Sequence, residues 1–219
     1  MGSFLDIVGG TFIGGMILLI VLSSTESSTR DFLNYNADAI VQNQMAHMVT
    51  IIESDIRKIG FGITEDQKST IIQTGQSDRL KFLAHLNMTI DMAPDTIEYI
   101  VTVGDTIDYG FRTIYMYKIT RKVTIVGQAP DKVMIGKIGN SEVFKYLDQI
   151  GRPVANPKTA RAVEVTLIAF DPQIVLSPGL TSKRLDNYQT IQEKNEELNR
   201  LIRPSFWRQT RLVSKNLKR

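Results

Sequence analysis

Residues 7–25 read IVGGTFIGGMILLIVLSST, and none of these nineteen residues is charged. As an α-helix they would extend over roughly 28 Å, close to the thickness of the hydrocarbon core of a bilayer. A secretory signal peptide would instead start with a basic segment and end at a small-residue cleavage site. No lysine or arginine precedes this stretch, and Asp6 stands directly before it. The sequence therefore predicts an uncleaved single-span anchor within residues 1–25, with a buried helix of a soluble protein as the alternative.

Two features of the anchor are candidates for assembly contacts. Gly10 and Gly14 are four residues apart, a spacing that lets helices approach closely in lipid, although glycine is also simply common in membrane helices. Asp6 places a carboxylate at the membrane edge, which is costly unless the group reaches the interface or meets a positive partner such as another subunit's terminal amine. We therefore select Asp6, Gly10 and Gly14 as assembly residues.

The helix is predicted to continue beyond the anchor. No glycine or proline occurs from Ser27 to Ile59, and apolar residues with two polar ones recur there at helical spacing. The recurring positions are Leu33, Ala37, Ile40, Gln44, Met48, Ile51, Asp55 and Ile59. Gly60-Phe61-Gly62 follows a basic last turn and ends the helix. We expect one helix from about Phe4 to about Ile59, amphipathic within residues 26–62, and leave open a local break among the serines and threonines at 23–28.

The remainder, residues 63–219, is predicted to form a β-rich head. Runs of β-branched and alternating residues predict strands at 79–86, 96–103, 114–126, 142–147, 162–170 and 206–213, with turns at Gly104-Asp105, Gly127, Gly139-Asn140 and Gly151. Apolar residues at helical spacing within 182–203 predict an inserted helix that ends before Pro204. The predicted fold class is therefore α+β, with a long N-terminal helix packed on an antiparallel β-sheet head.

Composition and motifs argue against an enzyme. The 219 residues include no cysteine, which excludes disulfides, thiol catalysis and cysteine-based metal sites. The two histidines, His47 and His85, stand apart from any ligand-like cluster, and no phosphate-binding glycine loop or nucleophile-elbow motif is present. Asp105 and Asp108 share one predicted turn, where solvated loop acids are a better interpretation than a calcium site. We expect no catalytic residue, no metal and no cofactor.

The end of the chain is basic. Seven of the 26 lysines and arginines follow Glu197, and no acidic residue does. Arg208 and Arg211 are interleaved with aromatic residues, which would suit an anionic lipid surface or single-stranded nucleic acid. In a strand, however, alternate residues point to opposite faces, so one face can pack on the core while the other meets an acidic neighbour. We favour this structural interpretation, with Arg208 and Arg211 as candidate contacts for an anionic partner, and do not expect nucleic acid.

Three stretches, in their order along the chain, resemble type IV pilins, and in particular minor pilins of the PilW and pseudopilin J kind. They are AHMVTIIESDIRKIGFG at 46–62, FKYLDQIGRP at 144–153 followed by ARAVEVTL at 160–167, and FWRQTRLV at 206–213. In that family similar runs close the long helix, form a turn and strand of the head, and make its last strand. The resemblance implies subunits that wait in the membrane and are then extracted into a filament with their apolar helices at its centre. It also implies that a buried acid, here Asp6, pairs with a neighbour's terminal amine.

The N-terminus departs from the family pattern. The family's leader is short and basic, ends in glycine, and precedes a phenylalanine and then a glutamate five residues into the mature chain. The first six residues here, MGSFLD, include no basic residue, and a cut after Gly2 would place the acid one position early. A pilin relative that works unprocessed is therefore an alternative.

The function expected from these observations is a structural subunit of a type IV pilus-like or pseudopilus filament. Its partners would be copies of itself or other pilin-like subunits, the lipid bilayer and the membrane assembly machinery. It would be a single-pass protein of the inner membrane with its C-terminal domain outside the cytoplasm, or part of an extracellular filament at the cell surface. The alternative is a single-span accessory subunit of a larger membrane complex. A membrane-anchored enzyme or binding protein is a third hypothesis, which no motif supports.

Overall fold

The computed structural model describes residues 2–64, 71–86, 93–170, 178–202 and 206–213. The chain divides into two compact units, Met1–Ile40 and Val41–Arg219. A single helix, α1 (Gly2–Arg57), crosses the boundary, so its first part is a unit on its own and its last part belongs to the head.

The helix α1 confirms the long N-terminal helix predicted from the sequence, and it runs without interruption through residues 23–28. Its threonines remain compatible with the helix because the hydroxyls of Thr11, Thr25 and Thr29 donate to backbone carbonyls four residues earlier, at 2.8–2.9 Å. Gly60, with φ of 69°, ends the helical region and donates its amide to the carbonyl of Leu83.

The first unit exposes nearly all of its large apolar side chains. They are Phe4, Ile7, Val8, Phe12, Ile13, Met16, Ile17, Leu18, Leu19, Ile20, Val21, Leu22, Phe32, Leu33, Tyr35 and Ile40. By length and composition, this helix near the N-terminus is able to cross a membrane. The finding agrees with the predicted anchor at this coarse level.

Five antiparallel strands form the larger sheet of the head, in the order β1 to β5. They are β1 (Ile72–Gly75), β2 (Arg79–Ala84), β3 (Asp95–Asp108), β4 (Thr113–Thr124) and β5 (Asp131–Ile138). The turn predicted at Gly104-Asp105 is wrong: β3 continues through it with a bulge between Val103 and Thr106. The chain instead reverses after Asp108, whose carboxylate accepts from the amide of Gly110, a residue with φ of 80°.

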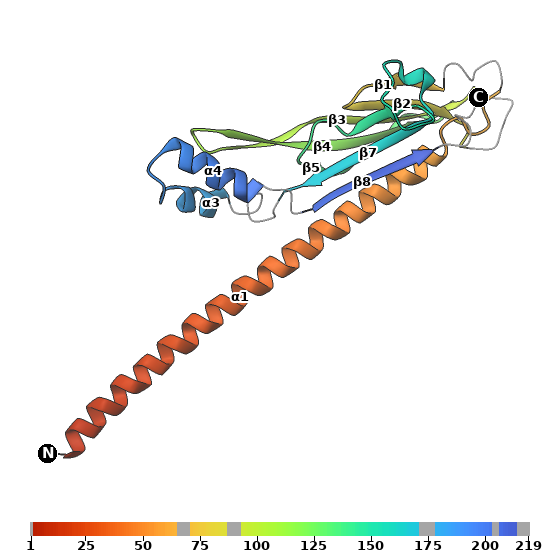
Figure 1. Ribbon diagram of the computed structural model, residues 1–219. Coiled ribbons are helices and arrows are strands. Elements are labelled where there is room, and N and C mark those ends of the chain that lie inside the picture. The colour runs from red at the N-terminus through yellow and green to blue at the C-terminus, as the bar shows by residue number, and fades with distance from the viewer. Residues whose placement is uncertain (1, 65–70, 87–92, 171–177, 203–205, 214–219) are drawn as a thin grey trace. The chain divides into compact units, whose positions relative to one another are not determined.

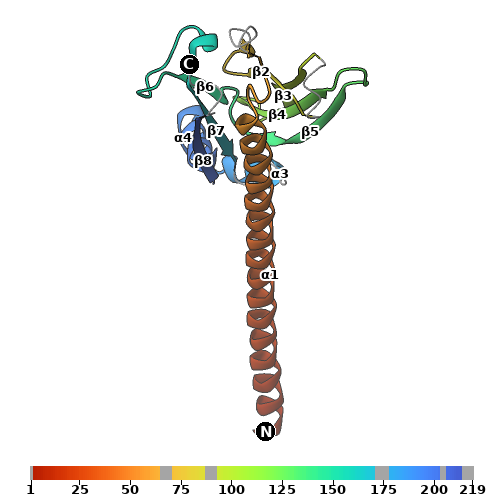
Figure 2. The ribbon, with the colours of Figure 1, turned by 90° about the vertical axis from the view of Figure 1, so that its right-hand side faces the viewer.

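A second, three-stranded antiparallel sheet has the order β6 (Phe144–Leu147), β7 (Ala162–Ala169) and β8 (Phe206–Val213). A short 3-10 helix, η2 (Pro157–Thr159), lies between β6 and β7. The head therefore contains two sheets where a single one was predicted. Figure 2 shows them on either side of the upper end of α1.

The core of the head lies where the last part of α1 meets both sheets. Met45, Met48, Val49, Ile52 and Ile56 are all buried there. An added Cβ at Gly136 of β5 would lie 2.1 Å from the sulfur of Met48, and the Thr210 hydroxyl of β8 donates to Glu53 Oε1 at 3.0 Å. Met48 and Glu53 are roughly 140° apart around a helix axis, so the two sheets contact different flanks of α1.

The predicted apolar stripe is only partly buried. Its later members Met48, Asp55 and Ile59 lie in the core, whereas Gln44 is exposed. Leu33 and Ile40 are also exposed, and both belong to the first unit. Burial of the helix within the head therefore begins near Met45, later than the periodicity indicated.

In place of the single helix predicted over 182–203, the structure has two, α3 (Pro178–Leu185) and α4 (Ile191–Ile202), drawn together in Figure 1; Arg203 lies outside the described residues. The break has a local cause. The Thr190 hydroxyl accepts from the amide of Glu193, and the Glu193 carboxylate accepts from the amide of Thr190, which makes a capping box that starts α4 afresh. Leu185 and Leu198 then close a small second core with Ile114 of β4.

Candidate functional site

The three predicted assembly residues lie along one stripe of α1. Asp6, Gly10 and Gly14 follow one another at intervals of four, so each is displaced by only about 40° around the helix. The Asp6 side chain is exposed, and it has no ion-pair partner in the described part of the chain. A Cβ added at Gly10 or Gly14 would meet no atom within 4 Å. Contacts with the described residues therefore do not require these glycines.

The most developed polar cluster of the head joins α1 to the centre of the larger sheet. Asp55 is 2% exposed, and its Oδ2 accepts hydrogen bonds from the Tyr99 hydroxyl at 2.6 Å and from Arg121 Nε at 2.5 Å. A second Arg121 nitrogen donates to Asp55 Oδ1 at 3.1 Å, which makes the pair bidentate. Lys58, one turn along the helix, approaches the same carboxylate at 3.7 Å.

The electrostatics of this cluster favour one protonation state. Burial, reinforced by the Asp55 carboxylate, raises the pKa of the Tyr99 hydroxyl far above its usual range. The hydrogen bond to Asp55 also raises the pKa of Arg121. The cluster is thus a neutral tyrosine hydroxyl, an ionised carboxylate and a guanidinium that hydrogen-bond to one another. The sequence marked Asp55 as a polar member of an apolar stripe, but it carried no signal for the choice of Arg121 as its partner.

Other buried carboxylates of the head are satisfied in the same way. Glu98 pairs with Arg79, and Glu197 pairs with Arg184 and Arg200. The Asp95 carboxylate accepts hydrogen bonds from the backbone amides of Leu86 at 2.9 Å and Val126 at 3.1 Å. It therefore connects the segments that follow β2 and β4. These carboxylates therefore maintain the fold, and none of them presents an unpaired acid or base.

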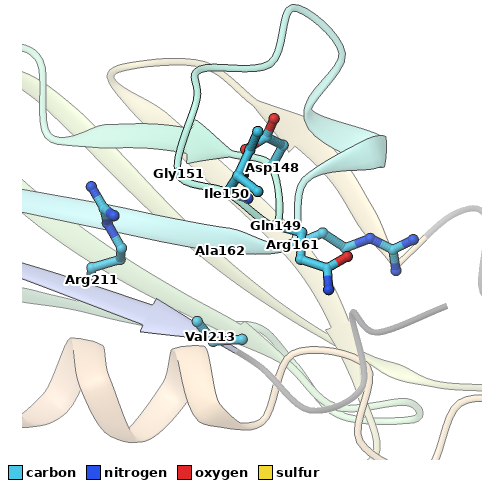
Figure 3. A pocket seen from close by; sticks show the side chains of 8 residues that line it. All are labelled: Asp148, Gln149, Ile150, Gly151, Arg161, Ala162, Arg211 and Val213. Carbon is cyan, nitrogen blue, oxygen red and sulfur yellow. Dashed lines mark hydrogen bonds between the residues drawn. The ribbon is translucent and has the colours of Figure 1, made fainter.

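A pocket among the described residues opens beside the loop after β6 and has a volume of about 540 Å³. Figure 3 shows the residues that line it: Asp148, Gln149, Ile150, Gly151, Arg161, Ala162, Arg211 and Val213. Asp148 Oδ1 already accepts the amides of Ile150 and Arg152, at 2.9 and 2.8 Å. These lining residues include no serine, cysteine or histidine, so they offer no nucleophile–base pair.

The structure separates the two arginines selected as contacts for an anionic partner. Arg211 lies over Glu164 on the neighbouring strand and donates to Glu164 Oε2 at 3.0 and 3.3 Å, so an internal carboxylate balances its charge. Arg208 is exposed on the opposite face of β8 and has no ion-pair partner in the described residues. The two side chains therefore do not form one anion site.

The remaining polar candidates are the two histidines and two aspartates of the head's larger sheet. His85 is buried in the head, and its Cβ would lie 3.0 Å from a Cβ added at Gly62; His47 is exposed on α1. Asp105 pairs with Lys137 at 2.5 Å, while Asp108 accepts from the turn that follows it. Within the described ranges no group of three or more acidic or histidine side chains could hold a metal ion.

Comparisons with known proteins add no assignment. No family model matches the chain. No match is found among curated proteins or among solved structures.

Proposed function

We propose that the chain is a structural subunit of a type IV pilus-like or pseudopilus filament, held in the inner membrane by α1 before assembly. The observation that carries the proposal is the division of α1. Its first part forms a separate unit whose apolar side chains have no cover of their own, whereas its last part is built into the core of the head. A helix of this kind needs lipid or other helices around it.

The stripe of Asp6, Gly10 and Gly14 supports assembly through this helix. The glycines provide a surface on which another helix can approach closely, and no contact with the described residues explains them. Asp6 would pair with a positive group of a neighbouring subunit. Such a buried pair fixes the alignment of the two helices more dependably than it stabilises them. The head has no catalytic role in this proposal, because its buried carboxylates are already paired within the fold.

The proposal is tested by electron microscopy of material sheared from the surface of cells that express the chain, together with the intact mass of the extracted protein. Filaments that contain the chain are expected, and the mass reports whether the N-terminus is processed. A chain found only in detergent-solubilised complexes of fixed stoichiometry would instead favour the single-span accessory subunit.

Matched variants separate assembly from membrane insertion. Gly10→Leu combined with Gly14→Leu keeps the segment apolar but blocks close helix approach, so the membrane-bound amount is expected to stay unchanged while filaments are lost. Met16→Leu on the same helix is the control and is expected to leave both unchanged. Asp6→Asn is expected to reduce assembly. Asp6→Glu keeps the carboxylate and is expected to assemble better than Asp6→Asn.

A further inference from the structure

The larger sheet has one face turned toward the last part of α1 and an outer face turned away from it. Tyr99 and Arg121 are register partners on β3 and β4, and both bond to Asp55 of α1. Because side chains alternate between the two faces of a strand, the residues next to them in sequence point away from α1. The outer face carries four lysines, called the lysine face: Lys81, Lys118, Lys122 and Lys132.

Three of these lysines lie in one row across the sheet. Lys81 on β2 is opposite Glu98 on β3, which is opposite Lys122 on β4. Lys122 is in turn opposite Lys132 on β5. Neighbouring strands are about 4.8 Å apart, so the row extends over roughly 14 Å. Lys118 follows the same face of β4 and lies four residues, or about 13 Å, from Lys122.

The four lysines have no ion-pair partner among the described residues. Lys118 and Lys132 are exposed, and the other two are half-buried. The acids beside them are engaged elsewhere.

Glu98 is only 4% exposed and is paired with Arg79, and Asp105 is paired with Lys137 at 2.5 Å. With both pairs neutral, the lysines give the outer face an uncompensated positive charge. Like charges held this close repel one another, so an anionic partner lowers the electrostatic energy of the face.

The uncharged side chains of the outer face indicate which anion suits it. In β3 to β5 they include Thr96, Thr102, Thr124, Ile100 and Met134, and the described residues of the face include no aromatic side chain. Single-stranded nucleic acid binds largely by stacking its bases on aromatic side chains. Reading a duplex needs an element that enters a groove. The flat strands of this face provide neither feature.

A straight row of ammonium groups suits a linear anion with evenly spaced charges. One sugar ring advances a linear glycan by a length similar to the spacing of neighbouring strands, so the carboxylates of a polyuronate can meet successive lysines of the row. Each such contact is a charge-assisted hydrogen bond. The threonine hydroxyls on both sides of the row can bond to the hydroxyl groups of the sugar.

We infer that the lysine face binds a linear acidic polysaccharide, with the chain of the polymer running across the strands along Lys81, Lys122 and Lys132. Lys118 holds a further carboxylate of the polymer beside the row. The face belongs wholly to the head, so the inference depends neither on the membrane anchor nor on the filament.

The test uses the full chain in non-ionic detergent micelles and a fluorescently labelled oligogalacturonate, with binding followed by fluorescence anisotropy. Lys118→Gln combined with Lys122→Gln is expected to weaken binding about fivefold, because two exposed charge contacts are lost. Lys145→Gln combined with Lys158→Gln is the matched control. It removes the same charge from two exposed lysines of β6 and η2 and is expected to leave binding unchanged. Equal weakening by the two double variants would overturn the inference.

Two further measurements separate charge at this face from other causes. Lys118→Arg combined with Lys122→Arg keeps both charges and is expected to retain binding, whereas a loss equal to that of the glutamine variant would contradict the role of charge. The oligogalacturonate with its carboxyl groups methyl-esterified is expected not to bind. Binding of this neutral polymer with unchanged affinity would also overturn the inference.

Other anions test the choice of partner. Double-stranded DNA and vesicles of phosphatidylcholine with phosphatidylglycerol are expected to bind more weakly than the oligogalacturonate at equal concentration of negative charge. If either bound more tightly and lost affinity in the variant with Lys118→Gln and Lys122→Gln, the face would belong to that anion and the polysaccharide would be wrong. Filaments without binding would remove this inference alone, and binding without filaments would leave it standing.

Discussion

Replacing Arg121 with methionine removes the guanidinium that satisfies Asp55 inside the head. Methionine keeps much of the length of the side chain, so the change is mainly one of charge and hydrogen bonding. The Asp55 side chain is 3% exposed and that of Arg121 24% exposed. After the substitution, the carboxylate would retain the Tyr99 hydroxyl at 2.6 Å and the Lys58 ammonium at 3.7 Å.

Removing one member of a buried ion pair costs about 3–5 kcal/mol, because the remaining charge stays desolvated. Arg121 is partly hydrated and Lys58 remains nearby, so we expect the lower end, about 3 kcal/mol of unfolding free energy. The matched control is Lys58→Met. Its contact with Asp55 is long and the lysine is 45% exposed, so its loss should cost no more than about 0.5 kcal/mol.

The assay is urea unfolding of the full chain in detergent micelles, followed by the circular dichroism of the head. The double variant Asp55→Leu with Arg121→Met removes both charges and should be more stable than Arg121→Met alone. If Arg121→Met lost less than about 1 kcal/mol, or no more than Lys58→Met, the paired charges would not be the reason for this cluster.

Three further predictions concern other parts of the head. Burial raises the pKa of both Tyr99 and Tyr146 above the unfolded value, so both stabilise the fold fully below about pH 10. Above that pH, the unfolding free energy should fall by roughly 1.4 kcal/mol per pH unit for each tyrosine. Urea titrations at rising pH should show this slope, and Tyr99→Phe should reduce it. Gly136→Ala would place a methyl group 2.1 Å from the buried Met48 sulfur and should cost about 1–3 kcal/mol in the same unfolding assay, whereas Gly10→Ala should cost nothing there. Thr190→Ala removes half of the capping box and should cost about 1 kcal/mol; hydrogen exchange of the α4 amides would show faster exchange, and unchanged rates would contradict the role of the cap.

Much of the secondary structure was predictable because it depends on local pattern. The uncharged run at 7–25 and the long stretch without glycine or proline predicted α1, and alternation predicted β8 over 206–213. Two strands were missed. β1 has only four residues, and β5 follows Pro130, begins with two charged residues and contains a glycine, so neither carries a strong strand pattern.

The break between α3 and α4 could have been predicted. Thr190 and Glu193 have the spacing of a capping box, a local signal for a new helix start, but the apolar periodicity on both sides suggested one continuous helix. The misplaced turn at Gly104-Asp105 is different. Glycine and aspartate are common in turns, and only the pairing of β3 with β4 across a bulge keeps them within a strand.

The sequence was sufficient for features that depend on near neighbours: an apolar helix of membrane length, the alternation of the strands, and the absence of cysteine chemistry. Only the tertiary structure decided which distant residues meet. Asp55 and Arg121 are 66 positions apart, and Glu164 and Arg211 are 47 apart. Many pairings of similar charge are compatible with one sequence. The packing of both sheets on α1 selects among them, because a buried carboxylate needs its partner within hydrogen-bonding distance.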